Sequence, residues 1–302
     1  MRILVTGAAG FAGRHLVREL RRRGWTVYGL VRRPAQAKAV RAMGATPVPG
    51  DVTRPADLKR AVRLARPDAA AHLAGMAFVP DAAKDPPLAR RVLVGGTGNL
   101  ARALPPECRF LVASTGMVYG PVRGRLPTEA TPPKPEGFYP ELKLEAEAAA
   151  RRIRPDLIVA RPFNHAGPGQ DPRFVVADFA RQIARIEAGL QEPRIQVGDL
   201  SSRRSFLDVR DVARAYADLL ARGRPGRTYN VAGPETSIRG LLDGLVLLAR
   251  LRVTVVSSAA KRRGTSRFAG SDARLRRELG WKPRIGLAKT LADTLAEWRA
   301  TT

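Results

Sequence analysis

The sequence predicts an α/β protein built on a doubly wound parallel sheet. Short apolar or β-branched runs alternate with helical patterns through the first half of its 302 residues, and this alternation is typical of parallel strands joined by helical crossovers. A chain of this length can bury a substantial core, and its 44% apolar content indicates a globular protein. We expect the crossovers to be right-handed.

Six strand-like runs and four helical patterns fill the first half. The predicted strands are 2–6, 26–31, 46–49, 69–73, 109–113 and 157–161. The predicted helices are 11–23, 56–65, 86–103 and 138–152. Because helices separate the strands, the pattern predicts βα units in one sheet, over a first domain of residues 1–162.

The pattern changes after Arg161. Residues 164–173 are polar and rich in Gly and Pro, which predicts a loop. Helices are predicted at 174–188, 208–222, 238–250, 271–279 and 286–299, and strands at 194–197, 228–231 and 251–256. We interpret 163–302 as a smaller α/β domain, from which 208–233 returns to the first.

A glycine-rich turn joins the first predicted strand to the first helix. Glycine permits the tight turn, the approach of a backbone to a pyrophosphate and close helix packing, and the helix N-terminus offers free N–H groups. A plain βα turn needs one glycine, whereas three stand here. The turn predicts a Rossmann-type dinucleotide site, with contacts from Gly7, Gly10, Phe11, Ala12 and Gly13.

The second predicted strand ends in Arg32 and Arg33. A site selective for NAD usually places a carboxylate here for the ribose 2′-hydroxyl, whereas arginine suits the 2′-phosphate of NADP. The alternative is a solvated pair at the end of a strand. With the glycine turn upstream, we predict NADP(H) as the cofactor.

Two further loops lie at the carboxyl edge of the predicted sheet. Additional cofactor contacts are expected from Asp51, Val52, Leu73, Ala74 and Gly75. His72 precedes the second loop, and a lone histidine on an apolar strand is interpreted as a core residue rather than a catalytic one.

A tyrosine and a lysine, Tyr139 and Lys143, stand four apart on one predicted helix face. A tyrosine hydroxyl can protonate a carbonyl oxygen while hydride reaches the carbon, if a nearby ammonium lowers its pKa. Thr115 follows the fifth strand, where a hydroxyl can bond the substrate oxygen.

In this order and spacing, these features resemble the extended short-chain dehydrogenase/reductase family, the NAD-dependent epimerase/dehydratase group, over nearly the whole chain. The resemblance implies Thr115, Tyr139 and Lys143 as the catalytic set, with Tyr139 and Lys143 also contacting the cofactor. Thr115 would also contact the substrate.

Other segments resemble the GDP-mannose dehydratase and reductase branch, and most of all its 4-keto reductases. These segments are 73–80, 159–170, 181–185, 198–200 and 204–209. The resemblance implies NADPH-dependent reduction of the C4 ketone of GDP-4-dehydro-6-deoxy-D-mannose to GDP-D-rhamnose. Asn164, Arg204 and Arg263 would bind the substrate. Arg204 could alternatively be a surface charge, and the base, guanine or thymine, stays open.

One position separates reductase from dehydratase. In the dehydratases of this family a carboxylate, often an Asp-Glu pair, directly follows the threonine, and here Gly116 and Met117 stand there. Neither can act as acid or base, so we expect no dehydration. Two alternatives to reduction stay open, a 4-epimerase of the same family and a non-catalytic Rossmann protein that binds nucleotide or RNA.

The chain departs from the family pattern in places. Pro140 follows Tyr139, which requires the helix to begin close to Phe138. Leu93 stands where the family often has an asparagine with a proposed proton-relay role, and Ser205 replaces a common aspartate.

The formal net charge of +26 has two interpretations, a polyanion partner or an arginine-rich chain with small anionic ligands. The basic residues are scattered rather than gathered in one stripe, so we expect neither nucleic acid nor membrane as a partner. A single cysteine, Cys108, fits the reducing cytoplasm and a place in the core. Three histidines and one cysteine predict no metal site, and the opening strand predicts no signal peptide.

The resemblance also implies a homodimer through helices 86–103 and 138–152. Their apolar faces, which would fit helix packing, carry Leu88, Leu93, Leu100, Leu142, Ala146 and Ala149. The alternative is that these faces pack only on the sheet of their own chain.

Overall fold

The computed structural model describes residues 1–257 and 266–302. A seven-stranded sheet lies at its centre, and its neighbouring strands are all parallel. Across the sheet run β10 (Thr228–Val231), β6 (Ile158–Pro162), β5 (Arg109–Ala113), β4 (Ala69–His72), β1 (Arg2–Thr6), β2 (Thr26–Val31) and β3 (Thr46–Pro49). The predicted doubly wound α/β class is confirmed.

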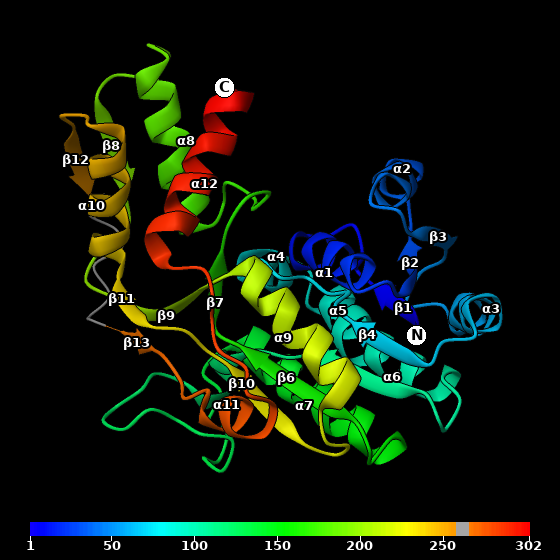
Figure 1. The fold of residues 1–302 in the computed structure, drawn as a ribbon. Helices are drawn as coiled ribbons and strands as arrows, with labels where there is room; N and C mark the ends of the chain where they lie inside the picture. The colour runs from blue at the N-terminus through cyan, green and yellow to red at the C-terminus, as the bar shows by residue number, and fades with distance from the viewer. Residues whose placement is uncertain (258–265) are drawn as a thin grey trace.

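Helices cover both faces of this sheet (Figure 1). One face carries α1 (Phe11–Arg22) and α9 (Val209–Arg222), and the other carries α3 (Pro55–Ala65), α6 (Gly96–Ala103) and α7 (Phe138–Ile153). The side chains of Ile3 and Ala71 pack in the apolar core of the first face, and those of Leu4 and Ala70 pack in the core of the second face. This division follows because successive strand side chains point to opposite faces.

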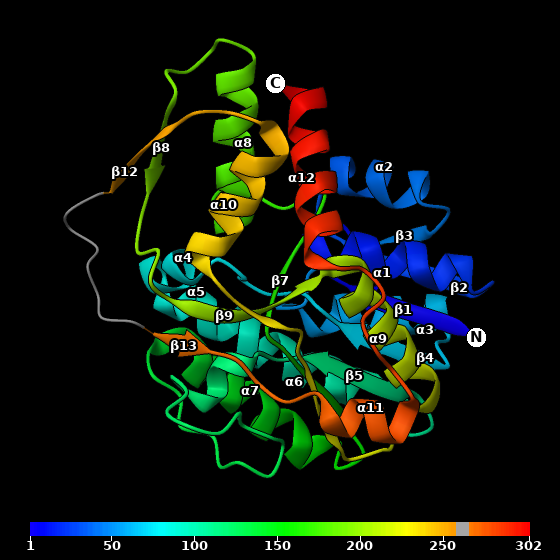
Figure 2. The same cartoon turned by 60° about the vertical axis from the view of Figure 1, so that its left-hand side comes forward.

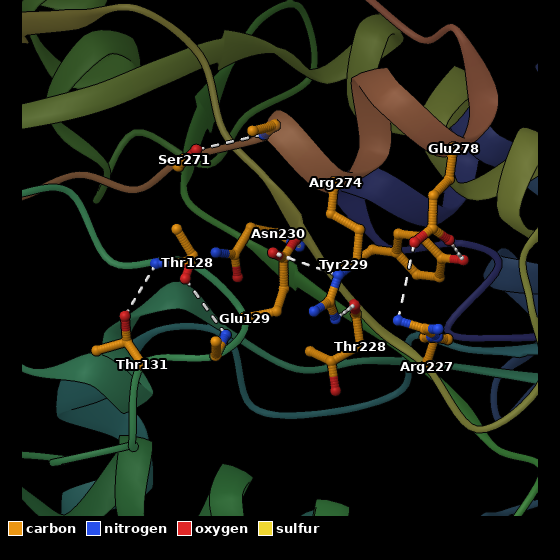
Figure 3. Close-up of polar contacts among 12 residues, drawn as sticks. Thr128, Glu129, Thr131, Arg227, Thr228, Tyr229, Asn230, Ser271, Arg274 and Glu278 are labelled. Atoms are coloured by element: carbon orange, nitrogen blue, oxygen red, sulfur yellow. Dashed lines mark hydrogen bonds and ion pairs between the residues drawn. The ribbon is translucent and has the colours of Figure 1, made fainter.

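Later segments return to the central sheet. α9 and β10 lie within 208–233, and α11 (Ala273–Leu279) joins them through Leu275. Figure 3 shows the attachment: Tyr229 of β10 donates to Glu278 of α11 at 2.8 Å, and Arg274 donates to the Thr228 carbonyl at 2.9 Å. How the chain divides into domains stays a prediction.

Three helices stand apart from the central sheet in both views (Figures 1 and 2). They are α8 (Val175–Glu187), α10 (Ile238–Ala249) and α12 (Leu287–Thr301), and they share a core with the paired strands β8 (Arg194–Val197) and β12 (Thr254–Ser257). The helices were predicted to within two residues, and β12 begins three residues later than predicted.

A smaller sheet was not predicted. Its strands are β11 (Glu235–Ser237), β9 (Arg203–Asp208) and β13 (Arg267–Phe268), and β7 (Asn164–Ala166) also pairs with β9. The prediction of a loop over 164–173 is therefore wrong at its start. These strands are short and mostly polar, and their pairing depends on backbones distant in sequence.

The predicted helix 86–103 is interrupted. It consists of α5 (Pro86–Arg90), a π-helical turn over Arg91–Gly95, and α6. Two short helices, α2 (Pro34–Ala42) and α4 (Val79–Lys84), were not predicted.

The apolar faces assigned to a dimer are largely covered within the chain. Leu93, Leu100, Leu142 and Ala146 are each no more than 2% exposed. Leu93 and Leu142 pack with Ala82 and Ala89 of α4 and α5 rather than on the sheet, and the dimer stays a prediction. Among the described residues, no helix is long and apolar enough to cross a membrane.

Candidate active site

A cavity of about 650 Å³ lies at the carboxyl ends of the central strands. Residues that follow β1 to β6 line it, together with residues of β7 and β9 and Phe268 of β13. Ligands of open α/β sheets bind at this edge, because the loops that follow parallel strands converge there. Residues from the central sheet and residues from the smaller sheet therefore line the same cavity.

The glycine turn forms one wall of the cavity. Gly7 has a φ of +70°, and a Cβ on Gly13 would lie 2.0 Å from the Gly7 carbonyl oxygen, so side chains are excluded at both positions. α1 begins at Phe11, and its first turn holds no acidic residue. Its free N–H groups can therefore receive a phosphate. Gly10 and Ala12 line the same wall.

Arg32 lines the cavity where β2 ends, and Arg33 does not line it. The two backbone N–H groups donate to the side-chain oxygen of Gln36, at 2.8 Å from Arg32 and 3.2 Å from Arg33. Arg32 lies 3.7 Å from Asp51, and its side chain is 55% exposed. This guanidinium is thus held near the cavity by a weak, open ion pair.

The loops after β3 and β4 contribute unequally. Val52, Leu73, Ala74 and Gly75 line the cavity. Asp51 does not line it. Its Oδ1 accepts hydrogen bonds from the backbone and the hydroxyl of Thr53, both at 2.8 Å.

Thr115 and Tyr139 face the cavity together. Thr115 follows β5, is 8% exposed, and accepts a hydrogen bond from the Met117 backbone at 3.2 Å. Tyr139 is the second residue of α7, which begins at Phe138 as Pro140 required. Burial raises the pKa of the Tyr139 hydroxyl to about 12.

Lys143 lies one helical turn beyond Tyr139 and is buried. Its ammonium donates to the carbonyl oxygen of Ala113, the last residue of β5. Burial lowers the pKa of Lys143 to about 8, although the charge of Glu147 acts in the opposite direction. Lys143 is not among the residues that line the cavity.

The predicted substrate contacts are placed differently. Asn164 begins β7 and lines the cavity. Arg204 is half-buried in β9 with its guanidinium carbon 4.9 Å from the centre of the Phe268 ring, and burial lowers its pKa. Phe268 lines the cavity, and Arg204, which is not among the lining residues, stacks on it at the cavity edge. Arg263 lies outside the described residues.

Several cavity residues were not predicted. One is Phe163, whose ring would be 2.6 Å from a Cβ on Gly116 and 2.1 Å from one on Gly270. The others include Gln36, Met76, Phe174, Phe206 and Phe268. Phe163 and His165 stand in the segment after β6, which was interpreted only as loop-shaping. The sequence around Phe206 and Phe268 does not indicate that they line the cavity, because the pairing of β9 and β13 brings them there.

His72 and Cys108 lie outside the cavity and are buried, as expected of core residues. His72 is 2% exposed, and its Nδ1 lies 2.8 Å from the Thr6 hydroxyl. Cys108 is buried, and burial raises the pKa of its thiol to about 12, which leaves it inert as a nucleophile.

Comparison with known proteins places this geometry among enzymes of nucleotide sugars. The pattern of the NAD dependent epimerase/dehydratase family matches residues 3–232. GDP-6-deoxy-D-mannose reductase from Pseudomonas aeruginosa is 39% identical over 99% of this chain and 97% of its own.

Solved structures show the same similarity. The structure of RMD from Pseudomonas aeruginosa complexed with NADPH superposes with a TM-score of 0.86 at 37% identity, over the whole of both chains. The UDP-glucose 4-epimerase of Thermus thermophilus in complex with NAD gives 0.84 at 28% identity, again over both whole chains.

Proposed function

The chain belongs to the NAD dependent epimerase/dehydratase family, and from this premise we propose that it is an NADP(H)-dependent oxidoreductase of deoxysugar biosynthesis. It reduces the C4 ketone of a nucleotide-activated 4-keto-6-deoxyhexose. The substrate is GDP-4-dehydro-6-deoxy-D-mannose and the product GDP-D-rhamnose. The observation that carries the proposal is one cavity lined by the glycine turn, Arg32, Thr115 and Tyr139, in a chain 39% identical to a GDP-6-deoxy-D-mannose reductase.

The residues present fit a dinucleotide with a 2′-phosphate. Gly7 and Gly13 let the backbone approach the pyrophosphate at the start of α1. Arg32, exposed and only weakly paired, is free to bond a phosphate in a bidentate manner. The bound cofactor supplies the hydride that reduces the C4 carbon.

Tyr139 is the proton donor for the C4 oxygen. Its hydroxyl is protonated at neutral pH, and Thr115 on the same cavity wall donates a hydrogen bond to the carbonyl oxygen. The Lys143 ammonium, held by the Ala113 carbonyl, stabilises the tyrosinate that forms as the proton leaves.

Asn164 and Arg204 hold the diphosphate end of the substrate. The Arg204 guanidinium is half-buried and stacked on Phe268, where water screens it little. An anion is attracted strongly to such a charge, so binding energy far from C4 positions the sugar for hydride transfer.

Dehydration lacks its catalyst in this cavity. Elimination needs a further acid or base at C5 and C6, in addition to Tyr139 at the C4 oxygen, and the cavity residue after Thr115 and Gly116 is Met117. Gly116 is also required by its packing on Phe163.

The test follows NADPH absorbance in the presence of 4-keto-6-deoxy nucleotide sugars. We expect oxidation of NADPH with the GDP sugar. Tyr139→Phe should reduce turnover by roughly 10²–10⁴-fold with little change in NADPH binding, because only the proton donor is lost. Tyr28→Phe is the matched control, since the Tyr28 hydroxyl accepts a hydrogen bond from Arg2 at 3.1 Å and Tyr28 does not line the cavity, and it should keep wild-type turnover.

Two outcomes would overturn the assignment. One is a wild-type rate for Tyr139→Phe. The other is formation of a 4-keto-6-deoxy product from GDP-mannose and NADP at a rate comparable with ketone reduction. Interconversion of two C4 epimers without net NADPH oxidation would instead identify a 4-epimerase.

We also propose a cytoplasmic homodimer. The single cysteine, Cys108, is free and buried, which suits a reducing compartment. Helices 86–103 and 138–152 would form the interface through outward residues such as Ala148, which is exposed.

A further inference from the structure

An ion pair lies buried beneath the candidate active site, between Glu147 of α7 and Arg161 of β6. The side chains are 4% and 7% exposed. Arg161 donates to the carboxylate from Nε at 3.0 Å and from Nη2 at 2.7 Å. Its Nη1 donates to the Tyr119 hydroxyl at 2.9 Å, which donates to Asn230 at 2.9 Å. The charges are therefore fully enclosed and well bonded.

This pair reaches the active site through the end of β5. The Ala113 carbonyl accepts from the Lys143 ammonium, and the next residue, Ser114, donates its hydroxyl to Glu147. The residue after that, Thr115, lines the cavity. Of these three consecutive residues, the first bonds Lys143, the second bonds Glu147 and the third lines the cavity. Lys143 and Glu147 stand four apart on α7 and are both buried, so the helix and the strand end are joined at two points.

Stability alone does not account for the pair. Removing two charges from water is unfavourable, and apolar residues of similar volume often serve as well or better. In some proteins a buried pair instead fixes one relative placement of the elements that carry it.

We propose that Glu147 and Arg161 are positioning residues of the proposed reduction. Glu147 keeps the Lys143 ammonium charged, and the pair holds α7 against the end of β5 so that Tyr139 and Thr115 meet the same carbonyl oxygen. Neither residue touches the substrate.

Among the described residues, few groups act on the charge of Lys143. Glu147 lies one turn further along α7, and His72 of β4 is neutral, its own pKa lowered further by the Lys143 charge. β5 contributes the neutral groups of Ala113 and Ser114. Arg161 of β6 acts through Glu147. Glu147 is therefore the carboxylate that opposes the effect of burial on Lys143.

The inference rests on the proposed function, and its test needs no substrate. The protein is labelled with ¹³C at the lysine ε-carbons and titrated by NMR. One resonance should titrate near pH 8, and Lys143→Met should abolish it. In Glu147→Gln the same resonance should titrate roughly one pH unit lower, because an opposite charge close by is lost. Glu147→Asp keeps the charge and should lie closer to wild type.

Glu278→Gln is the matched control. Glu278 is also a buried carboxylate, 7% exposed and bonded by Tyr229 (Figure 3), but it lies on α11 away from the cavity. Its loss should leave the Lys143 titration unchanged. If Glu147→Gln does not fold, Glu147→Leu/Arg161→Met, which replaces the pair with apolar side chains, should fold and still lower the titration.

Kinetics provides a second readout. In ketone reduction, kcat/KM should fall at high pH as Lys143 loses its proton. In Glu147→Gln this fall should occur at a lower pH, by the same amount as the shift in the NMR titration, while the Kd for NADPH stays unchanged. An unchanged Lys143 titration in a folded variant without Glu147 would overturn the inference. A wild-type enzyme that reduces no ketone but shows the NMR shift would overturn the proposed function alone.

Discussion

Tyr139 and Lys143 occupy surroundings that disfavour charge on either side chain. Burial raises the pKa of Tyr139 to about 12 and lowers that of Lys143 to about 8. A protonated tyrosine one helical turn from an ammonium is prepared to give a proton to a carbonyl oxygen. In the proposed mechanism these protonation states favour reduction at neutral pH.

The buried imidazole of His72 makes stability depend on pH. Its Nε2 has no hydrogen-bond partner among the described residues, and burial lowers its pKa from 6.5 to about 3. Between these values the unfolded chain binds a proton that the folded chain does not. The stability present above pH 6.5 is thus lost as pH falls toward 3, and by pH 5 the loss is about 2 kcal/mol.

Urea unfolding at pH 7 and pH 5 tests this prediction. Between pH 7 and pH 5, the free energy of unfolding of the wild type should fall by about 2 kcal/mol more than that of His72→Gln. Carboxylates contribute equally to both proteins, so the difference isolates His72. Equal pH dependence of the two proteins would contradict the prediction.

The turn between β2 and α2 is built to present arginine. The side-chain oxygen of Gln36 accepts hydrogen bonds from the backbone N–H groups of Arg32 and Arg33. These bonds fix the turn without using either guanidinium group. A helix of nine residues with Pro34 in its first turn follows, and the fixed φ of proline favours a helix start there. The element thus offers positive charge at the edge of the cavity.

Arg32→Ala/Arg33→Ala should bind NADPH no more tightly than NADH. Charge-assisted hydrogen bonds to the 2′-phosphate are lost, which weakens NADPH binding on the order of 10²-fold. Gln36→Glu keeps the turn but adds a negative charge, and it should also weaken NADPH more than NADH. Fluorescence titration with both cofactors measures the effect.

Arg21→Ala/Arg22→Ala controls for the loss of two charges. These arginines end α1 and bond Trp25 and Glu19, away from the cavity. Their loss should preserve the preference for NADPH. Unchanged discrimination in the Arg32→Ala/Arg33→Ala protein would refute the assignment of the cofactor site.

At the scale of the molecule, long-range attachments hold the segments around the cavity. The loop before α7 bonds the chain near β13, since the Val122 backbone donates to the Arg267 carbonyl at 2.7 Å and that of Ser271 to the Pro127 carbonyl at 3.0 Å. Glu129, in the same loop, accepts from the Asn230 backbone at 2.8 Å (Figure 3). The segment that leads to Tyr139 is therefore tied to both β10 and β13.

Assembly is the prediction that belongs to the whole molecule. Light scattering at micromolar concentration should give twice the mass of one chain. Ala148→Arg, on the exposed face of α7, should give monomers because it places a charge in the interface. Leu247→Arg alters an exposed residue of α10 and should leave the dimer intact. A wild-type monomer would count against the proposal.

The sequence alone determined the parallel sheet, the glycine turn, the arginine pair after β2 and the helix that carries Tyr139 and Lys143. Each depends on periodicity or on neighbours a few residues away, which the order of residues records directly. Tertiary structure decided the rest. The pairing of β7, β9, β11 and β13, the return of α11 and the enclosure of Glu147 with Arg161 depend on backbones and charges brought together from distant segments. Burial also decided the protonation of Lys143 and His72, because desolvation is set by the surrounding fold rather than by adjacent residues.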